Sequence, residues 1–251
     1  MLDVRLFRNT VFTGAITANL ISMMVDVGFI YFASQHLQLV SGLPPMYAGM
    51  LLIPGTLATI IAGLVIARVA VHFHPAQVVS FGLALNAAAF AVLAFLGAHH
   101  DVVIILIFIV LGTGIGIAQT ISNDLMLSSV PPRKAGAASA ISETSYETGA
   151  VLGTVIIGGM LTAVYRANVV VPDGLDETLA DHAHETLGGA VSVASYVGGE
   201  QANQLLSSAF AAFDSGVVLS SAFSAVLMGV MAVISYFMIR KAPREMKPAE
   251  H

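Results

Sequence analysis

The chain has 251 residues, of which 57% are hydrophobic and only 10% are charged, and its formal net charge is −5. Soluble globular domains carry about a quarter of their residues as charged side chains. The composition therefore excludes an ordinary soluble domain and indicates a membrane protein, as does a mean hydropathy of +0.86. The chain has no cysteine, which excludes disulfides, thiol chemistry and cysteine-based metal sites.

Six segments are apolar enough to cross a bilayer as helices, which takes roughly 20 residues each. Proline, glycine, histidine and aspartate mark most of the breaks between them. In chain order, the segments are 10–34, 46–70, 76–98, 102–123, 136–165 and 212–239. The sequence thus predicts an all-α polytopic membrane protein with six transmembrane helices.

The first span carries an acid, Asp26, in its second half. A carboxylate inside a bilayer is costly and normally faces a cavity or a partner, and no lysine or arginine occurs at a comparable depth in any span. We predict that Asp26 belongs to a proton- or substrate-binding site. The alternative is a polar contact between helices, with Asn19, Asn86 or Gln119 as the partner.

Glycines cluster in two of the spans. Gly112, Gly114 and Gly116 of the fourth span resemble a dinucleotide-binding fingerprint only superficially, because the strand and βαβ context that such a site requires are missing. In the fifth span, Gly149 and Gly153 form a small-xxx-small pattern. Glycines in a membrane span let neighbouring helices approach closely, so we expect all five to serve helix packing.

The fifth span also carries two acids, Glu143 and Glu147, in the sequence KAGAASAISETSYETGAVLGTVIIGGM of residues 134–160. Their spacing of four residues places both on one face of a helix. Because intramembrane acids are by default functional, we predict a site here that takes up protons and attracts cations. The alternative is a pair of hydrogen-bonded acids that fasten helices together.

A long segment, 166–211, separates the fifth span from the last and contains six acids. We expect it to lie on the external side as a loop with an amphipathic helix or helical hairpin. An alternative is that residues 186–211 form part of another membrane element. After the last span, residues 240–251 form a tail.

The basic residues indicate the orientation of the chain. Nine of the ten lysines and arginines fall on one side of the predicted spans, and Arg166 alone falls on the other. Cytoplasmic loops carry an excess of lysine and arginine, so both termini and the tail are expected in the cytoplasm. The nine are Arg5, Arg8, Arg68, Arg133, Lys134, Arg240, Lys241, Arg244 and Lys247.

Sequence motifs for other classes of protein are missing. The histidine pairs lie outside the apolar cores and show no metal-ligand spacing, and the sequence contains no nucleophile elbow, P-loop or basic aromatic patch. We therefore predict no enzyme activity, no metal, no cofactor and no nucleic-acid partner.

Two segments resemble a known family. VPPRKAGAASAISETSYETGAVLGTVIIGG looks like the penultimate-helix region of the fourteen-helix drug:proton antiporters of the major facilitator superfamily, the branch that contains quaternary-ammonium efflux pumps. LDVRLFRNTVF resembles the entry into the C-terminal six-helix half of that family, and the resemblance covers essentially the whole chain. It implies one half of a major facilitator fold. Glu143 and Glu147 match acidic positions associated with cationic drug recognition or proton coupling, whereas Asp26 matches no family motif.

The resemblance implies proton-coupled export of lipophilic cations across a bacterial cytoplasmic membrane, with the proton as coupling ion. The expected partners are such compounds, membrane lipid and an N-terminal transporter half, supplied by the same longer chain, a separate chain or a second copy. Two alternatives remain open: a proton-coupled exporter of a neutral or anionic metabolite, and a membrane scaffold that does not transport.

One segment departs from the family pattern. The loop after the second helix of this half usually resembles a GxLaDRxGxR motif, which contributes to conformational switching. Here the corresponding residues 63–77 read GLVIARVAVHFHPAQ, with Val71 and His74 where aspartate and glycine are expected. The gating role of this loop is therefore not predicted for this chain.

Overall fold

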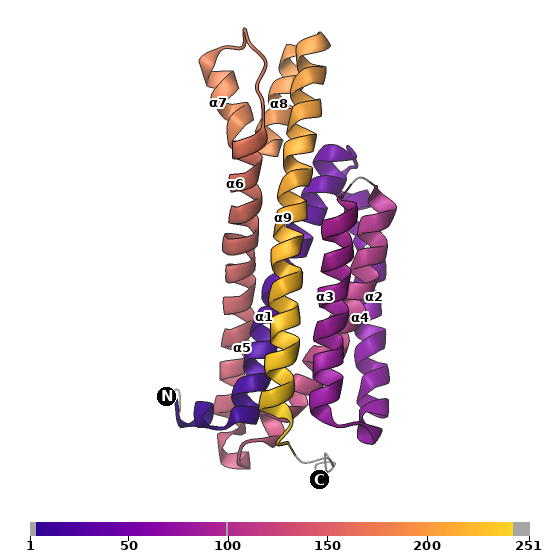
Figure 1. Cartoon of the computed structure of the whole chain (residues 1–251), viewed down its shortest axis with the longest axis vertical. Coiled ribbons are helices and arrows are strands. Elements are labelled where there is room, and N and C mark those ends of the chain that lie inside the picture. Colours follow the sequence, from indigo (N-terminus) through magenta and orange to yellow (C-terminus); the bar gives the residue numbers. More distant parts are fainter. Residues whose placement is uncertain (1–3, 99, 243–251) are drawn as a thin grey trace.

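The computed structural model describes residues 4–98 and 100–242, and within these ranges it contains helices and no strand. Six helical segments are long and apolar enough to cross a membrane: Thr10–Val40, Pro45–His72, Pro75–Leu96, Asp101–Ser128, Pro132–Asn168 and Gly199–Ile239. The predicted fold class, an all-α polytopic protein with six spans, is confirmed (Figure 1).

The first four spans form one helix each, and local residue types explain where three of them begin. α1 (Thr10–Gln35) starts after Asn9, whose side-chain oxygen accepts the amide hydrogen of Val11. α2 (Pro45–Val69) and α3 (Pro75–Leu96) both start with proline, which suits the first helical position because its amide hydrogen is not needed there. α4 is Asp101–Ser128.

The first span is longer than expected. A π-helical turn, His36–Val40, continues α1 beyond residue 34. His36 is buried, and its Nε2 lies 3.2 Å from Oδ1 of Asp101 at the start of α4. The Ser41 hydroxyl donates to the same carboxylate oxygen at 2.6 Å. These contacts tie the segment that follows α1 to the start of α4, at the end of the bundle opposite the termini.

The fifth span is interrupted by a wide turn. α5 (Ala135–Leu152) passes into a π-helical segment, Gly153–Gly158, and continues as α6 (Gly159–Asn168). Single π-turns inside α-helices are rare and frequently occur at functional sites.

The last span begins earlier than expected. Segment 166–211 contains α7 (Glu177–Glu185) and α8 (Leu187–Val197), and α9 (Gly199–Ile239) starts well before residue 212. The polar residues Glu200, Gln201, Asn203 and Gln204 interrupt the apolar pattern, but they lie on the part of α9 that extends past the other spans (Figure 1). A helix outside the bilayer has no need to be apolar on every face.

The α7–α8 hairpin is attached to the bundle by specific contacts. The buried hydroxyl of Tyr165 donates to the backbone oxygen of Ala183 at 2.8 Å. Arg166 donates from Nε to the backbone oxygen of Glu185 at 3.1 Å. Both bonds hold α7 against the end of α6.

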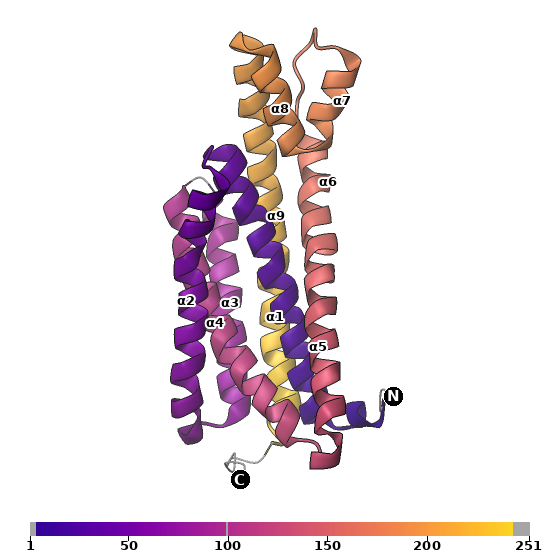
Figure 2. The ribbon, with the colours of Figure 1, turned by 180° about the vertical axis from the view of Figure 1, so that it is seen from behind.

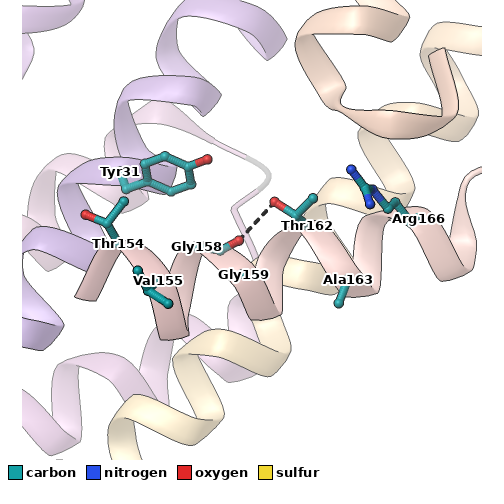
Figure 3. Close-up of a pocket in the computed structure, with 8 residues that line it drawn as sticks. All are labelled: Tyr31, Thr154, Val155, Gly158, Gly159, Thr162, Ala163 and Arg166. Carbon is teal, nitrogen blue, oxygen red and sulfur yellow. Dashed lines mark hydrogen bonds between the residues drawn. The ribbon is translucent and has the colours of Figure 1, made fainter. Parts of the chain in front are cut away.

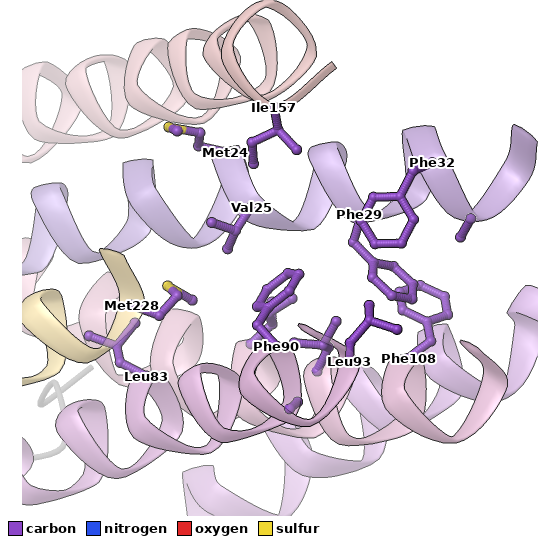
Figure 4. Packing of buried hydrophobic residues seen from close by; sticks show 14 of the residues in the cluster. Met24, Val25, Phe29, Phe32, Leu83, Phe90, Leu93, Phe108, Ile157 and Met228 are labelled. Atoms are coloured by element: carbon purple, nitrogen blue, oxygen red, sulfur yellow. The ribbon is translucent and has the colours of Figure 1, made fainter. Parts of the chain in front are cut away.

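The bundle has two broad faces. One face, which contains α3 and α9, is turned toward the viewer in Figure 1. The opposite face, which contains α1 and α2, is turned toward the viewer in Figure 2. Between the faces, aromatic rings from three helices fill the core, as Figure 4 shows. The Phe29 ring stacks on Phe108 with centroids 5.1 Å apart, and it meets Phe90 edge-on at 6.3 Å.

The five glycines lie where helices cross closely. Gly112 and Gly116 of α4 face α2, and Gly114 faces α3; a Cβ on Gly112 would collide with the carbonyl oxygen of Gly55. Gly149 and Gly153 face α1. A Cβ on Gly153 would collide with the carbonyl oxygen of Met24.

Positive charge gathers at one end of the bundle, where both termini lie in Figure 1. Arg68 lies in the last turn of α2, Arg133 and Lys134 precede α5, and Arg240 follows α9. Arg166 is in the last turn of α6, at the opposite end. The side chain of Arg5 lies outside the described residues. So do residues 243–251 of the expected tail 240–251, which include Arg244 and Lys247.

Candidate functional site

The two acids of the fifth span lie on an open face of α5. Glu143 and Glu147 are exposed one turn apart, whereas Ser142, Ser145 and Gly149 of the same helix turn into the bundle. Within residues 4–98 and 100–242, neither carboxylate has a hydrogen-bond or ion-pair partner. The acids therefore do not fasten described helices to one another, and their oxygens are free to accept a proton or to attract a cation.

A partly buried polar cluster lies directly behind the acids. The Asn123 amide of α4 donates to the Tyr146 hydroxyl at 2.8 Å. Oδ1 of Asn123 accepts from the Ser142 hydroxyl at 3.2 Å and from Nδ2 of Asn19 at 3.3 Å. Polar side chains in a bilayer need such partners, because no water is present to replace them. The cluster connects α1, α4 and α5 at the level of Glu143 and Glu147.

Sequence reasoning missed this cluster. Asn123 is the last residue of the predicted fourth span, 102–123, and no role is predicted for Tyr146 or Ser142 from the sequence. The available signal was an amide within an apolar segment, which predicts a partner on another helix without identifying it.

Asp26 lies apart from the acid pair. It is partly buried in α1, between Met24 and Gly28, both of which face Gly153. Gly153 is six residues beyond Glu147, so Asp26 lies roughly 9 Å farther along the helix axis than Glu147. The structure does not pair these carboxylates.

The polar partners considered for Asp26 are engaged elsewhere or do not reach it. Asn19 donates to Asn123, and Asn86 packs against Gly114 of α4. Across the described part of the chain, Asp26 has no hydrogen-bond or ion-pair partner, Gln119 included. The alternative to a binding role, a polar contact between helices, is therefore not formed by Asp26 within the described residues.

A polar groove follows the acids along the same helix. Thr154 lies seven residues, or about two turns, beyond Glu147 and so continues its face. Thr154 lines a cavity of about 540 Å³ at the π-helical segment, shown in Figure 3. The Thr162 hydroxyl there donates to the Gly158 carbonyl at 3.0 Å. The lining residues are Tyr31, Thr154, Val155, Gly158, Gly159, Thr162, Ala163 and Arg166.

Metal-binding chemistry finds no support in the side chains that the structure describes. In this part of the chain, no group of three histidine, aspartate or glutamate residues is close enough to hold an ion.

Comparison with known proteins relates this helix bundle to transporters. Residues 3–154 match the family model described as the Major Facilitator Superfamily. The chain belongs to the Major Facilitator Superfamily. This membership and the six apolar spans indicate an integral membrane protein of a transporter family and not an enzyme.

The proteins similar to this chain include two resistance proteins and an efflux pump. The chain is 45% identical to "Multidrug efflux pump LfrA" of Mycolicibacterium smegmatis over 93% of its length and 47% of the relative. It is 32% identical to "Methyl viologen resistance protein SmvA" of Salmonella typhimurium, over 97% of the chain and 50% of the relative. It is 25% identical to "Tetracenomycin C resistance and export protein" of Streptomyces glaucescens, over 100% of the chain and 48% of the relative. The chain spans about half the length of the curated relatives it matches.

Proposed function

We propose that this chain is the C-terminal half of a proton-coupled multidrug exporter of the fourteen-helix branch. The observation that carries the proposal is the exposed pair Glu143 and Glu147 on a membrane-spanning helix. The relatives support drug export through their names, which describe efflux pumps and resistance proteins.

The proposed mechanism is competition between protons and a cationic substrate. A carboxylate at depth is stable when it is protonated or when it meets a cation. If each ligand favours a different conformation of the transporter, then binding of one drives release of the other. Glu143 and Glu147 carry this exchange, and the Asn123–Tyr146 contact holds their helix in place behind them.

The proposed substrates are lipophilic cations. The face that carries Glu143, Glu147 and Thr154 has two acids and hydroxyl groups, which suit a positive charge. The name of SmvA refers to resistance to methyl viologen, a doubly charged organic cation.

The proposed partner is an N-terminal half that covers the open helices. Only 6% of the most apolar stretch of the α2 span is buried in this bundle, compared with 50% for the α4 span. The acid face of α5 is open as well. The same longer chain, a separate chain or a second copy can supply the missing wall, and substrate then binds between the halves. The cluster of basic residues at one end supports a position in the bacterial cytoplasmic membrane with both termini inside.

The test is efflux of ethidium from a drug-sensitive bacterial strain that expresses the complete transporter, with both of its halves, measured with and without a protonophore. We expect gradient-dependent efflux, and we expect Glu147→Gln to lower it about 5- to 150-fold, the usual range of coupling between two ligands. Glu200→Gln is the matched control, because Glu200 is exposed in the first turn of α9, beyond the apolar core. Equal efflux from both variants at equal expression would contradict the proposal.

Arg166 favours a second candidate, an exporter of an anionic compound. Its side chain lines the groove beyond the acids, and a guanidinium binds carboxylates and phosphates well. An Arg166→Gln variant separates the candidates. Loss of anion export with ethidium efflux intact supports the second candidate, and absence of anion export from the unaltered transporter rejects it.

A further inference from the structure

We propose that a cavity at the end of the bundle that holds the termini binds the phosphate group of an anionic phospholipid. The cavity has a volume of about 230 Å³ and is lined by His74, Gln77, Tyr236 and Arg240. It lies between the first turn of α3 and the last turn of α9, two helices that run side by side in Figure 1.

Arg240 supplies the charge that attracts the phosphate. Its guanidinium lies 5.2 Å from the centre of the Phe237 ring, which holds it beside the cavity. Among the described residues, no acidic side chain lines the cavity, and Arg240 forms no ion pair. An arginine stays protonated at all ordinary pH values and matches the geometry of phosphate oxygens.

His74 offers a second hydrogen-bond donor, and its contact with the backbone of α3 decides which of its two ring nitrogens donates. The backbone amide of Ala76 donates to Nδ1 of His74 at 3.2 Å. Since Nδ1 accepts, a neutral ring carries its hydrogen on Nε2, which can therefore donate. The Gln77 amide and the Tyr236 hydroxyl are further donors. A phosphate diester offers only acceptor oxygens, so this set of side chains complements it.

The surroundings favour a lipid over a soluble phosphate compound. The cavity lies where two spans end, and the exposed surface next to it is apolar. Phe81 lies one turn beyond Gln77 and is 61% exposed, and Val233, one turn before Tyr236, is 57% exposed. An acyl chain can lie along these side chains while the headgroup occupies the cavity. Arginine and tyrosine at a membrane surface are typical anchors for anionic lipids.

The measurement is native mass spectrometry of the purified protein in detergent with equal amounts of phosphatidylglycerol and phosphatidylcholine. We expect preferential retention of phosphatidylglycerol and a loss of about fivefold in Arg240→Gln, the effect of one basic residue near a charged membrane. Arg68→Gln is the matched control: Arg68 is an exposed arginine at the same end, but among the described residues it bonds only the Leu64 carbonyl of its own helix and lies outside the cavity.

A second variant keeps the test independent of folding. His74→Asp preserves the cap of α3, because aspartate is a favourable N-cap, and it places a negative charge in the cavity. We expect it to abolish the preference for phosphatidylglycerol with the thermal stability unchanged. Equal losses in Arg240→Gln and Arg68→Gln, or release of the bound lipid by inorganic phosphate, would overturn the proposal. Lipid binding is measured without transport, so the outcome does not depend on the proposed export function.

Discussion

The side-chain amide of Asn123 donates a hydrogen bond of 2.8 Å to the Tyr146 hydroxyl, and this bond joins α4 to the helix that carries the acid pair. Oδ1 of the same amide accepts from Asn19 and Ser142. One side chain therefore connects three helices. Since Tyr146 directly precedes Glu147, the cluster sets the position of α5 just behind the exposed acids.

Removing the hydroxyl should measure this connection. We expect Tyr146→Phe to destabilise the protein by about 1 kcal/mol, because it leaves a partly buried amide donor of Asn123 unsatisfied. The readout is thermal unfolding in detergent. Tyr47→Phe is the control, because the Tyr47 side chain is exposed and its hydroxyl bonds to none of the described residues. Equal melting temperatures for the two variants would show that the bond contributes nothing.

The crossing of α1 and α5 leads to a second prediction. A Cβ at Gly153 would collide with the Met24 carbonyl oxygen, whereas a Cβ at Gly159 meets no atom within 4 Å. We expect Gly153→Ala to destabilise by about 1–3 kcal/mol, the usual cost of overpacking. Gly159→Ala should be neutral or stabilising by up to about 1 kcal/mol, because alanine favours a helix. Unfolding curves of both variants check the difference, and a stable Gly153→Ala would show that the helices do not cross this closely.

The sequence contained most of the fold but not all of its boundaries. The fold class could be predicted because a bilayer imposes one length and one composition on every span. The start of α9 could not, because the polar residues between Glu200 and Gln204 resemble a loop when hydropathy is the only criterion. Packing of Leu205 and Ala209 in the core continues the helix through them.

The site was predictable in part, for a similar reason. Helical spacing alone places Glu143 and Glu147 on one face, since both lie on a single helix. The Asn123–Tyr146 bond joins two spans, and the sequence contains no information on which amide faces which hydroxyl. The same limit explains why Asn19 was considered as a partner for Asp26 when it in fact bonds to Asn123.

Two aspartates in the membrane spans provide the last prediction, because their surroundings differ. Asp26 has no partner in the part of the chain that the structure describes, whereas Asp101 lies 3.2 Å from His36 and accepts from Ser41 at 2.6 Å. An unpaired acid at depth costs a few kcal/mol. We therefore expect Asp26→Asn to leave the melting temperature unchanged or higher. Asp101→Asn should lower it, because this substitution weakens a charge-assisted contact to a buried histidine.

If Asp26 also takes part in proton or substrate binding, export by Asp26→Asn falls about 5- to 150-fold while its stability holds. Parallel measurement of melting and ethidium efflux separates the two roles, and full efflux in a stable Asp26→Asn protein would remove Asp26 from the site.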